Sequence, residues 1–144
     1  HRDLHSFPTR RSSDLLASES RDNGLTWSKP YDTDFPNPGA GIEVHVLADG
    51  TWALLYNDLE RDRWSLALSL SDDEGRTWKW TRHVERDEHN QPRSSFHYPS
   101  ILQARDGTLQ LTYSYFQNHI PAGGPRKTIR HARLNVEWVK ASGH

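Results

Sequence analysis

Short runs of alternating apolar and polar residues follow one another along most of the chain, separated by Gly, Pro, Asn and Asp. A period of two broken by turn-forming residues is typical of β-strands and not of helices. The pattern predicts strands over residues 15–20, 28–32, 42–47, 51–57, 64–69, 81–84, 98–104, 108–115 and 128–134. Residues 35–41 and 87–96 carry Pro, Asn, Gly and charge, so we expect them to connect sheets, and we expect no amphipathic helix.

Two motifs occur twice in the sequence. Residues 20–27, SRDNGLTW, and residues 71–78, SDDEGRTW, both fit S-x-D-x-G-x-T-W and start 51 residues apart. A second pair interleaves with them, because VLADGTWALLY around Gly50 matches LQARDGTLQLTY around Gly107, 57 residues further on. A unit of about 50–57 residues therefore recurs, which is the size of one blade of a β-propeller.

Each motif has a structural interpretation. An Asp-Gly pair between two apolar runs predicts a hairpin turn, because glycine accepts a positive φ. In the eight-residue box, the Ser and Asp side chains can bond nearby backbone N–H groups, the Gly can turn left-handed, and the Trp can fold back beneath the turn as an apolar plug. We therefore assign a structural role to Ser20, Asp22, Gly24, Thr26, Trp27, Ser71, Asp73, Gly75, Thr77 and Trp78.

Together these motifs resemble the BNR or Asp-box repeat domains of the sialidase superfamily, over residues 16 to about 140. The resemblance implies an all-β fold, a partial six-bladed β-propeller of about two and a half four-stranded antiparallel blades. The remaining blades are expected upstream, so residues 16–144 are interpreted as the C-terminal part of the domain. The implied function is that of an exo-α-sialidase-like glycoside hydrolase, which removes a terminal acidic sugar from glycans. We expect the chain alone to be inactive, because half of its pocket is missing.

The first fifteen residues, HRDLHSFPTRRSSDL, have neither a helical nor a strand period. They resemble, codon by codon, the translation of a common short-read sequencing adapter. We therefore expect residues 1–15 to be non-native and disordered, and we exclude them from the interpretation of the fold.

The amino-acid composition limits the classes of ligand and partner that we expect. The chain has 144 residues, a formal charge of −1 and no cysteine, which suits one small domain without disulfides or thiolate metal sites. No basic run suggests nucleic acid, and no apolar stretch approaches the roughly 20 residues that span a bilayer. Glycan is the expected partner, and neither a cofactor nor a metal is expected, because neither His45 nor His97 has a partner at metal-ligand spacing. The compartment is not set by the sequence, although a secreted or periplasmic location agrees with the resemblance.

Tyr98 is the most informative candidate for chemistry. Sialidases are exceptional among glycosidases in using a Tyr nucleophile, and the family's Tyr opens the inner strand of a late blade shortly before an Asp-Gly hairpin. The segment YPSILQARDG, which begins at Tyr98, reproduces that placement. A tyrosine packed at the start of a strand is the structural alternative. Glu43 is predicted one blade earlier, at the same end of the inner strands as Tyr98. It is the base that activates the phenol, a carboxylate that binds a hydroxyl, or an exposed strand residue.

The other predicted pocket residues are Asn57, Ser114 and His45, which the hairpin register brings to the inner strands. The family binds the substrate carboxylate with three arginines. No such set is found among the residues expected at the pocket end of the inner strands. Residues 60–63, ERDR, are interpreted as a solvated hairpin tip. Two other functions remain open: a lyase on acidic glycans with Tyr98 as acid or base, and a non-catalytic propeller that binds carbohydrate or protein.

Overall fold

The computed structural model describes residues 14–120 and 126–141, and these form three antiparallel sheets whose strands follow one another in chain order. The first sheet pairs β1 (Asp14–Ala17) with β2 (Tyr31–Pro36). The second comprises β3 (Glu43–Val46), β4 (Trp52–Tyr56), β5 (Ser65–Ser71) and β6 (Trp80–Arg86). The third comprises β7 (Ser95–Gln103), β8 (Leu109–Gln117) and β9 (Arg126–Leu134), and a short helix, α1 (Val136–Lys140), follows it.

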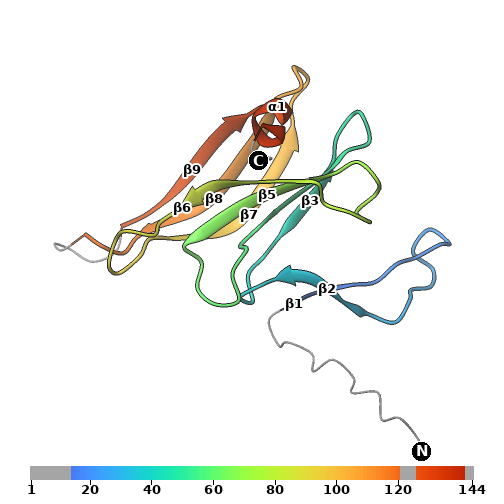
Figure 1. Ribbon diagram of the computed structural model, residues 1–144, viewed down its shortest axis with the longest axis horizontal. Helices are drawn as coiled ribbons and strands as arrows, with labels where there is room; N and C mark the ends of the chain where they lie inside the picture. Colours follow the sequence, from blue (N-terminus) through green and yellow to red (C-terminus); the bar gives the residue numbers. More distant parts are fainter. Residues whose placement is uncertain (1–13, 121–125, 142–144) are drawn as a thin grey trace, which may run out of the picture.

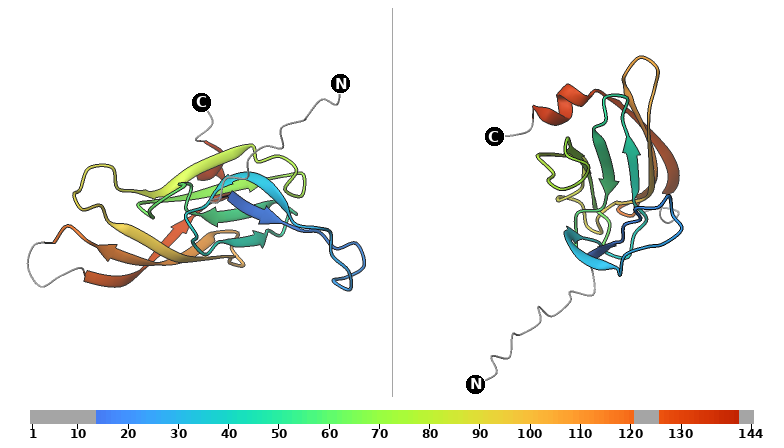
Figure 2. Two further views of the ribbon diagram at one scale, coloured as in Figure 1. Left: turned by 90° about the horizontal axis from the view of Figure 1, so that it is seen from below. Right: turned by 90° about the vertical axis from the view of Figure 1, so that its right-hand side faces the viewer.

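The four-stranded sheet lies between the other two (Figure 1). One of its faces packs on β7–β9 through the main core, and the other packs Leu54, Tyr56 and Ala67 against Phe35 of β2. Figure 2 shows the same order from two further sides. The main core comprises Leu47, Ala53, Leu55, Leu66, Leu68, Leu70, Phe96, Ile101, Leu109, Leu111, Tyr113, Tyr115 and Val139. The all-β, partial-propeller prediction is confirmed, with half a blade, a full blade and three strands of the next.

Strand β5 alternates leucine with serine and alanine, although none of its residues is exposed. All seven of its residues are buried, since it is an inner strand of a sheet that is covered on both faces. A strand buried on both sides needs small or apolar residues at every position, and SLALSLS meets that requirement. The hydroxyl of Ser69 lies 2.7 Å from that of Thr81 on β6, so this buried serine has a hydrogen-bonding partner.

The hydrogen bonds predicted for the two boxes are present in both. In the second box, the Ser71 hydroxyl donates to Asp73 at 2.8 Å and accepts from the Gly75 N–H at 2.8 Å. Asp73 also accepts from the backbone and the hydroxyl of Thr77. The first box repeats this network at the same distances. These bonds, above all those from the threonine, lower the pKa of Asp22 and of Asp73 to about 2.

The two box tryptophans differ in burial. Trp78 lies beneath its turn and meets Phe35 edge-on, with ring centroids 5.4 Å apart. Trp27 folds back far enough for its indole N–H to donate to the Gly24 carbonyl at 3.1 Å, yet it remains 64% exposed. The prediction of an apolar plug is therefore confirmed for Trp78 and wrong for Trp27. The described part of the first sheet has two strands and offers no full sheet face to cover that indole.

Most strand boundaries fall within a few residues of the prediction. Strand β7 begins three residues early, at Ser95, and β2 continues through residues that were expected to be a connection. Strand β1 includes Asp14 and Leu15, which were assigned to the adapter-like segment, whereas residues 1–13 lie outside the described part. The absence of a helix was wrong, because α1 follows β9. Its N-cap is Asn135, whose side chain accepts from the Trp138 N–H at 2.7 Å.

Candidate functional site

The candidate site lies at the end of the sheets where β3 and β7 begin and β4 and β8 end, which we call the rim. Tyr98 is there, in β7, at a bulge where the pairing with β8 shifts register. It is 71% exposed and has a φ of +49°. A bulky residue in the left-handed region is an outlier, and such strain is often found at functional positions.

Tyr98 lies against the chain that leads into the neighbouring blade. A Cβ built on Gly41, two residues before β3, would be 3.7 Å from Cδ1 of the phenol ring. On its other side, the rings of Tyr98 and His97 have centroids 6.2 Å apart. The exposed phenol is therefore placed where the first strands of two adjacent sheets meet.

Glu43 is half-buried at the start of β3. Its Oε2 accepts the backbone N–H of Ile101 at 2.9 Å, so the carboxylate reaches from one sheet to the first strand of the next. This bond ties Glu43 to the strand that carries Tyr98. The structure thus brings the two predicted catalytic residues to the same junction.

Asn57 is fully buried and joins the two sheets from within. Its amide nitrogen donates to the Ser65 carbonyl at 2.7 Å and to the Phe96 carbonyl at 3.2 Å. Its Oδ1 is also buried and has no hydrogen-bond partner among the described residues. The structure therefore places Asn57 as a brace behind the rim and not in its predicted position in the pocket.

The remaining predicted pocket residues are separated from each other. Ser114 is half-buried and pairs with His97 in the β7–β8 register. His97 directly precedes Tyr98 in the chain. His45 is half-buried on β3 and pairs with Ala53, two residues further from the rim than Glu43. Ser114 therefore belongs to the rim, and His45 lies deeper along the sheet.

Arg63 is a rim residue that sequence reasoning missed. It was assigned to a solvated hairpin tip, but its side chain turns inward. One terminal nitrogen lies 2.8 Å from Nδ1 of His97, and the other donates to the Gly39 carbonyl at 3.1 Å. Its position two residues before the buried strand β5 was the available signal, since a long side chain there can fold back over the sheet end.

His97 is held as a neutral imidazole. Arg63 can only donate, so Nδ1 must accept, and the proton on Nε2 is then donated to the Ser95 hydroxyl at 2.8 Å. Burial, followed by the positive charge of Arg63, lowers the pKa of His97. The ring therefore acts as a fixed link between Arg63 and β7 at neutral pH.

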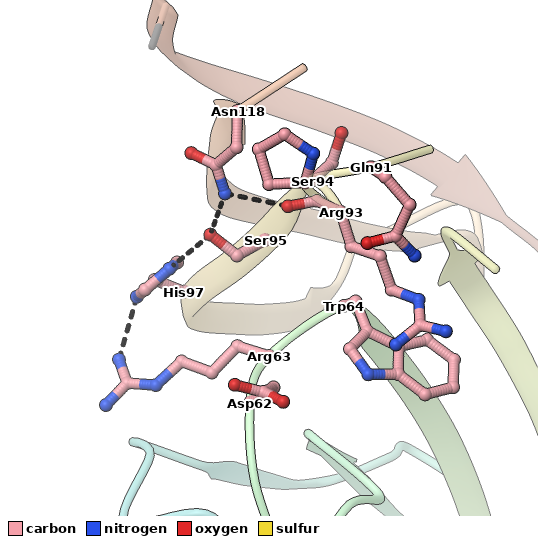
Figure 3. A pocket seen from close by; sticks show the side chains of 10 residues that line it. Asp62, Arg63, Trp64, Gln91, Arg93, Ser94, Ser95, His97 and Asn118 are labelled. Carbon is pink, nitrogen blue, oxygen red and sulfur yellow. Dashed lines mark hydrogen bonds between the residues drawn. The ribbon is translucent and has the colours of Figure 1, made fainter. Parts of the chain in front are cut away.

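A hollow of about 500 Å³ is lined in part by His97, and Tyr98 is not among its lining residues. Figure 3 shows it between the loop that precedes β5, the loop that precedes β7 and the residue that follows β8. It is lined by Asp62, Arg63, Trp64, Gln91, Pro92, Arg93, Ser94, Ser95, His97 and Asn118. In the described part of the chain no group of three or more His, Asp or Glu side chains is placed to hold a metal ion. No described helix is long and apolar enough to cross a membrane.

The architecture and the rim define a class: a piece of a β-propeller pinned by Asp-box turns, with an exposed, left-handed tyrosine at the junction of two blades. A family model described as a BNR repeat-like domain matches residues 4–111. The chain belongs to this family.

One solved structure provides a comparison for the fold. The intramolecular trans-sialidase from Ruminococcus gnavus, in complex with oseltamivir carboxylate, is 18% identical to this chain with a TM-score of 0.66. The match covers 90% of this chain and 29% of that chain. This chain therefore spans less than a third of the length of the trans-sialidase. A search of curated proteins found no match.

Proposed function

We propose that this chain is the C-terminal part of a sialidase-like glycoside hydrolase that removes a terminal acidic sugar from glycans. Membership of the BNR family and the fold shared with a trans-sialidase support the reaction class. The single observation that carries the proposal is Tyr98, an exposed phenol held in a left-handed conformation at the rim. Residues 1–13, which precede β1, are proposed to be foreign to the domain.

The phenol of Tyr98 is proposed as the nucleophile. Its oxygen attacks the anomeric carbon as the bond to the leaving group breaks, and water then hydrolyses the glycosyl-tyrosine, with retention of configuration. A neutral phenol suits an acidic sugar, because a carboxylate nucleophile would be repelled by the carboxylate of the substrate. The exposure of Tyr98 leaves its oxygen open to a ligand at the rim.

Glu43 is proposed as the base that takes the phenol proton. The carboxylate of Glu43 is held toward β7 by the Ile101 N–H, which bonds one of its two oxygens. The second oxygen is then the one to accept the proton during attack. A base fixed to the same strand as the nucleophile keeps the distance between them constant.

Arg63 is proposed to bind the carboxylate of the substrate. Of the five N–H groups of a guanidinium, His97 and Gly39 use two, and the others remain for an anion. Ser114, on the same rim, is proposed to bind a hydroxyl of the sugar, while the deeper His45 supports the strand that carries Glu43. Further arginines and the general acid are proposed to lie in the rest of the full-length protein.

Substitution of Tyr98 by phenylalanine in the full-length protein tests the nucleophile. Tyr98→Phe should lower the turnover of a fluorogenic sialoside by several orders of magnitude, because the attacking oxygen is lost while the ring is kept. Circular dichroism and thermal melting of the variant should match those of the wild type, since the side chain is exposed.

Tyr31→Phe provides the matched control. Tyr31 is also exposed, and its hydroxyl donates to Glu19 at 2.8 Å on a sheet that contributes nothing to the described rim. It should turn over the sialoside at the wild-type rate. Unchanged turnover in Tyr98→Phe would overturn the nucleophile assignment, and a product with a new double bond would indicate the lyase reaction instead.

A further inference from the structure

The hollow beside His97 shares Arg63 with the proposed reaction at Tyr98, and its other lining residues have no role in that reaction. It lies at the same rim, between the loops that lead into β5 and β7, and it includes the first residues of β7. Its volume of about 500 Å³ is within the range of small-molecule sites. His97 separates the two regions, because its ring lines the hollow and also neighbours the ring of Tyr98.

One wall of the hollow is ordered by its own hydrogen bonds. These run from Arg63 to His97, from His97 to Ser95 at 2.8 Å, and from the amide nitrogen of Asn118 to the Arg93 carbonyl at 2.8 Å (Figure 3). The same amide nitrogen lies 3.5 Å from the Ser95 hydroxyl. Since these groups hold one another, a ligand would meet a preformed surface and would not have to order it.

The opposite wall carries polar groups that are not used by the fold. The guanidinium of Arg93 lies over the indole of Trp64, 4.7 Å from the ring centroid. Stacking leaves the N–H groups in the guanidinium plane available, and none of the ion pairs between described side chains involves Arg93. The exposed side chains of Gln91 and Asp62 also line the hollow.

This mixture of groups suits a sugar better than a simple anion. Sugar hydroxyls both donate and accept hydrogen bonds. The hollow offers donors on Arg93 and acceptors on Asp62, with an amide on Gln91 that does both. A site for a free multivalent anion would not include a carboxylate, because the carboxylate and the bound anion would repel each other.

We propose that this hollow is a subsite for the sugar on the leaving-group side of the bond that Tyr98 cleaves, held by Arg93 and Gln91. The inference rests on the proposed function. The terminal sugar reacts where β3 and β7 begin, so the rest of the glycan must leave across the loops of the rim. The hollow is lined by loops of that rim and starts at His97, the residue next to the proposed nucleophile.

The test uses the full-length protein and two substrates with the same acidic sugar. One carries an aryl leaving group, and the other carries lactose. In the double variant Gln91→Ala/Arg93→Ala, the ratio of kcat/KM for the lactoside to that for the aryl glycoside should fall about tenfold, mainly through KM, because charged hydrogen bonds to the second sugar are lost. The Asn118 bond to the Arg93 backbone survives these changes.

Arg105→Ala is the matched control, since Arg105 is an exposed arginine at the opposite end of β7, beside the Asp106–Gly107 turn. Its kcat/KM ratio should equal that of the wild type. An unchanged ratio in the double variant overturns the subsite, and this includes the case in which kcat/KM falls by the same factor for both substrates.

Direct binding separates the subsite from the reaction. Lactose alone, titrated into the full-length protein and followed by NMR, should bind more weakly to the double variant than to the wild type. If the wild type cleaves neither substrate, the hydrolase proposal fails, and the lactose titration still decides the subsite. Equal binding of lactose to both proteins overturns it.

Discussion

At the scale of single residues, the rim is defined by side chains that are fixed by a neighbouring strand or sheet. Glu43 is held by Ile101, Arg63 by Gly39 and His97, and Tyr98 follows directly in a strained conformation. A left-handed tyrosine costs roughly 1–3 kcal/mol, which the surrounding contacts must offset. The strain is thus a property of the whole junction and not of Tyr98 alone.

The pH dependence of stability should reveal the neutral state of His97. A lowered pKa means that the unfolded chain, where histidine titrates near pH 6.5, binds the proton more readily than the folded one. This contribution to stability is therefore complete above about pH 6.5 and is lost as pH falls through the lowered pKa. Between about pH 7.5 and pH 5, the wild type should lose more free energy of unfolding than His97→Gln, measured by urea denaturation. Parallel losses in both proteins would contradict the assignment.

Two turn glycines with nearly the same φ should respond differently to alanine. Gly50 has a φ of +87° and an open site, whereas a Cβ on Gly75, with a φ of +80°, would be 3.1 Å from the Trp52 ring. Gly50→Ala should cost about 1–2 kcal/mol from backbone strain alone. Gly75→Ala should cost about 1–3 kcal/mol more, because Trp52 must move. Urea unfolding of both variants checks the order, and equal losses would show that the indole yields freely.

At the scale of strands and helices, local sequence carries most of the fold. The strands and Asp-Gly hairpins follow from alternation and turn residues, which act over a few positions. The helix α1 was missed because five residues are too few to show a helical period, although Asn135 was a usable N-cap signal. Arg63 and Asn57 were misplaced for another reason: their partners lie 24–39 residues away, and local pattern does not encode such contacts.

The docking of α1 depends on long-range packing. Val139 is fully buried in the core, and the Arg82 guanidinium lies 3.9 Å from the centroid of the Trp138 ring and donates to its carbonyl. Val139→Ala should lower the free energy of unfolding by about 2 kcal/mol, through lost burial and a small cavity. Val46→Ala is the control, because Val46 is 55% exposed on β3, and it should cost less than about 1 kcal/mol. Similar losses in thermal or urea unfolding would mean that α1 is not anchored by this residue.

At the scale of the whole molecule, the sheets are joined by polar bridges as well as by apolar packing. Glu85 of β6 accepts from Tyr113 of β8 at 2.7 Å and pairs with Arg130 of β9. Among the described strands, β9 pairs only with β8, so its other edge is unpaired there.

The unpaired edge of β9 predicts the behaviour of residues 16–144 expressed alone. We expect oligomers or aggregates and no cooperative melting transition, because a propeller blade that lacks a strand exposes backbone donors and acceptors. Analytical ultracentrifugation and thermal melting monitored by circular dichroism measure this directly. A monomer that melts in one sharp transition would show that these three sheets are sufficient as a folding unit.

The two ends of the sheets differ in how they are closed, and this difference bears on redesign. The turns at Asp49, Asp73 and Asp106 are stabilised by bonds within a few residues, so each one is self-contained. The loops at the opposite end take their shape from hydrogen bonds to other loops, distant in the sequence. A change of substrate specificity would therefore require those loops to be exchanged together. The compact turns, in contrast, offer places to attach a tag or a solid support without altering the proposed site.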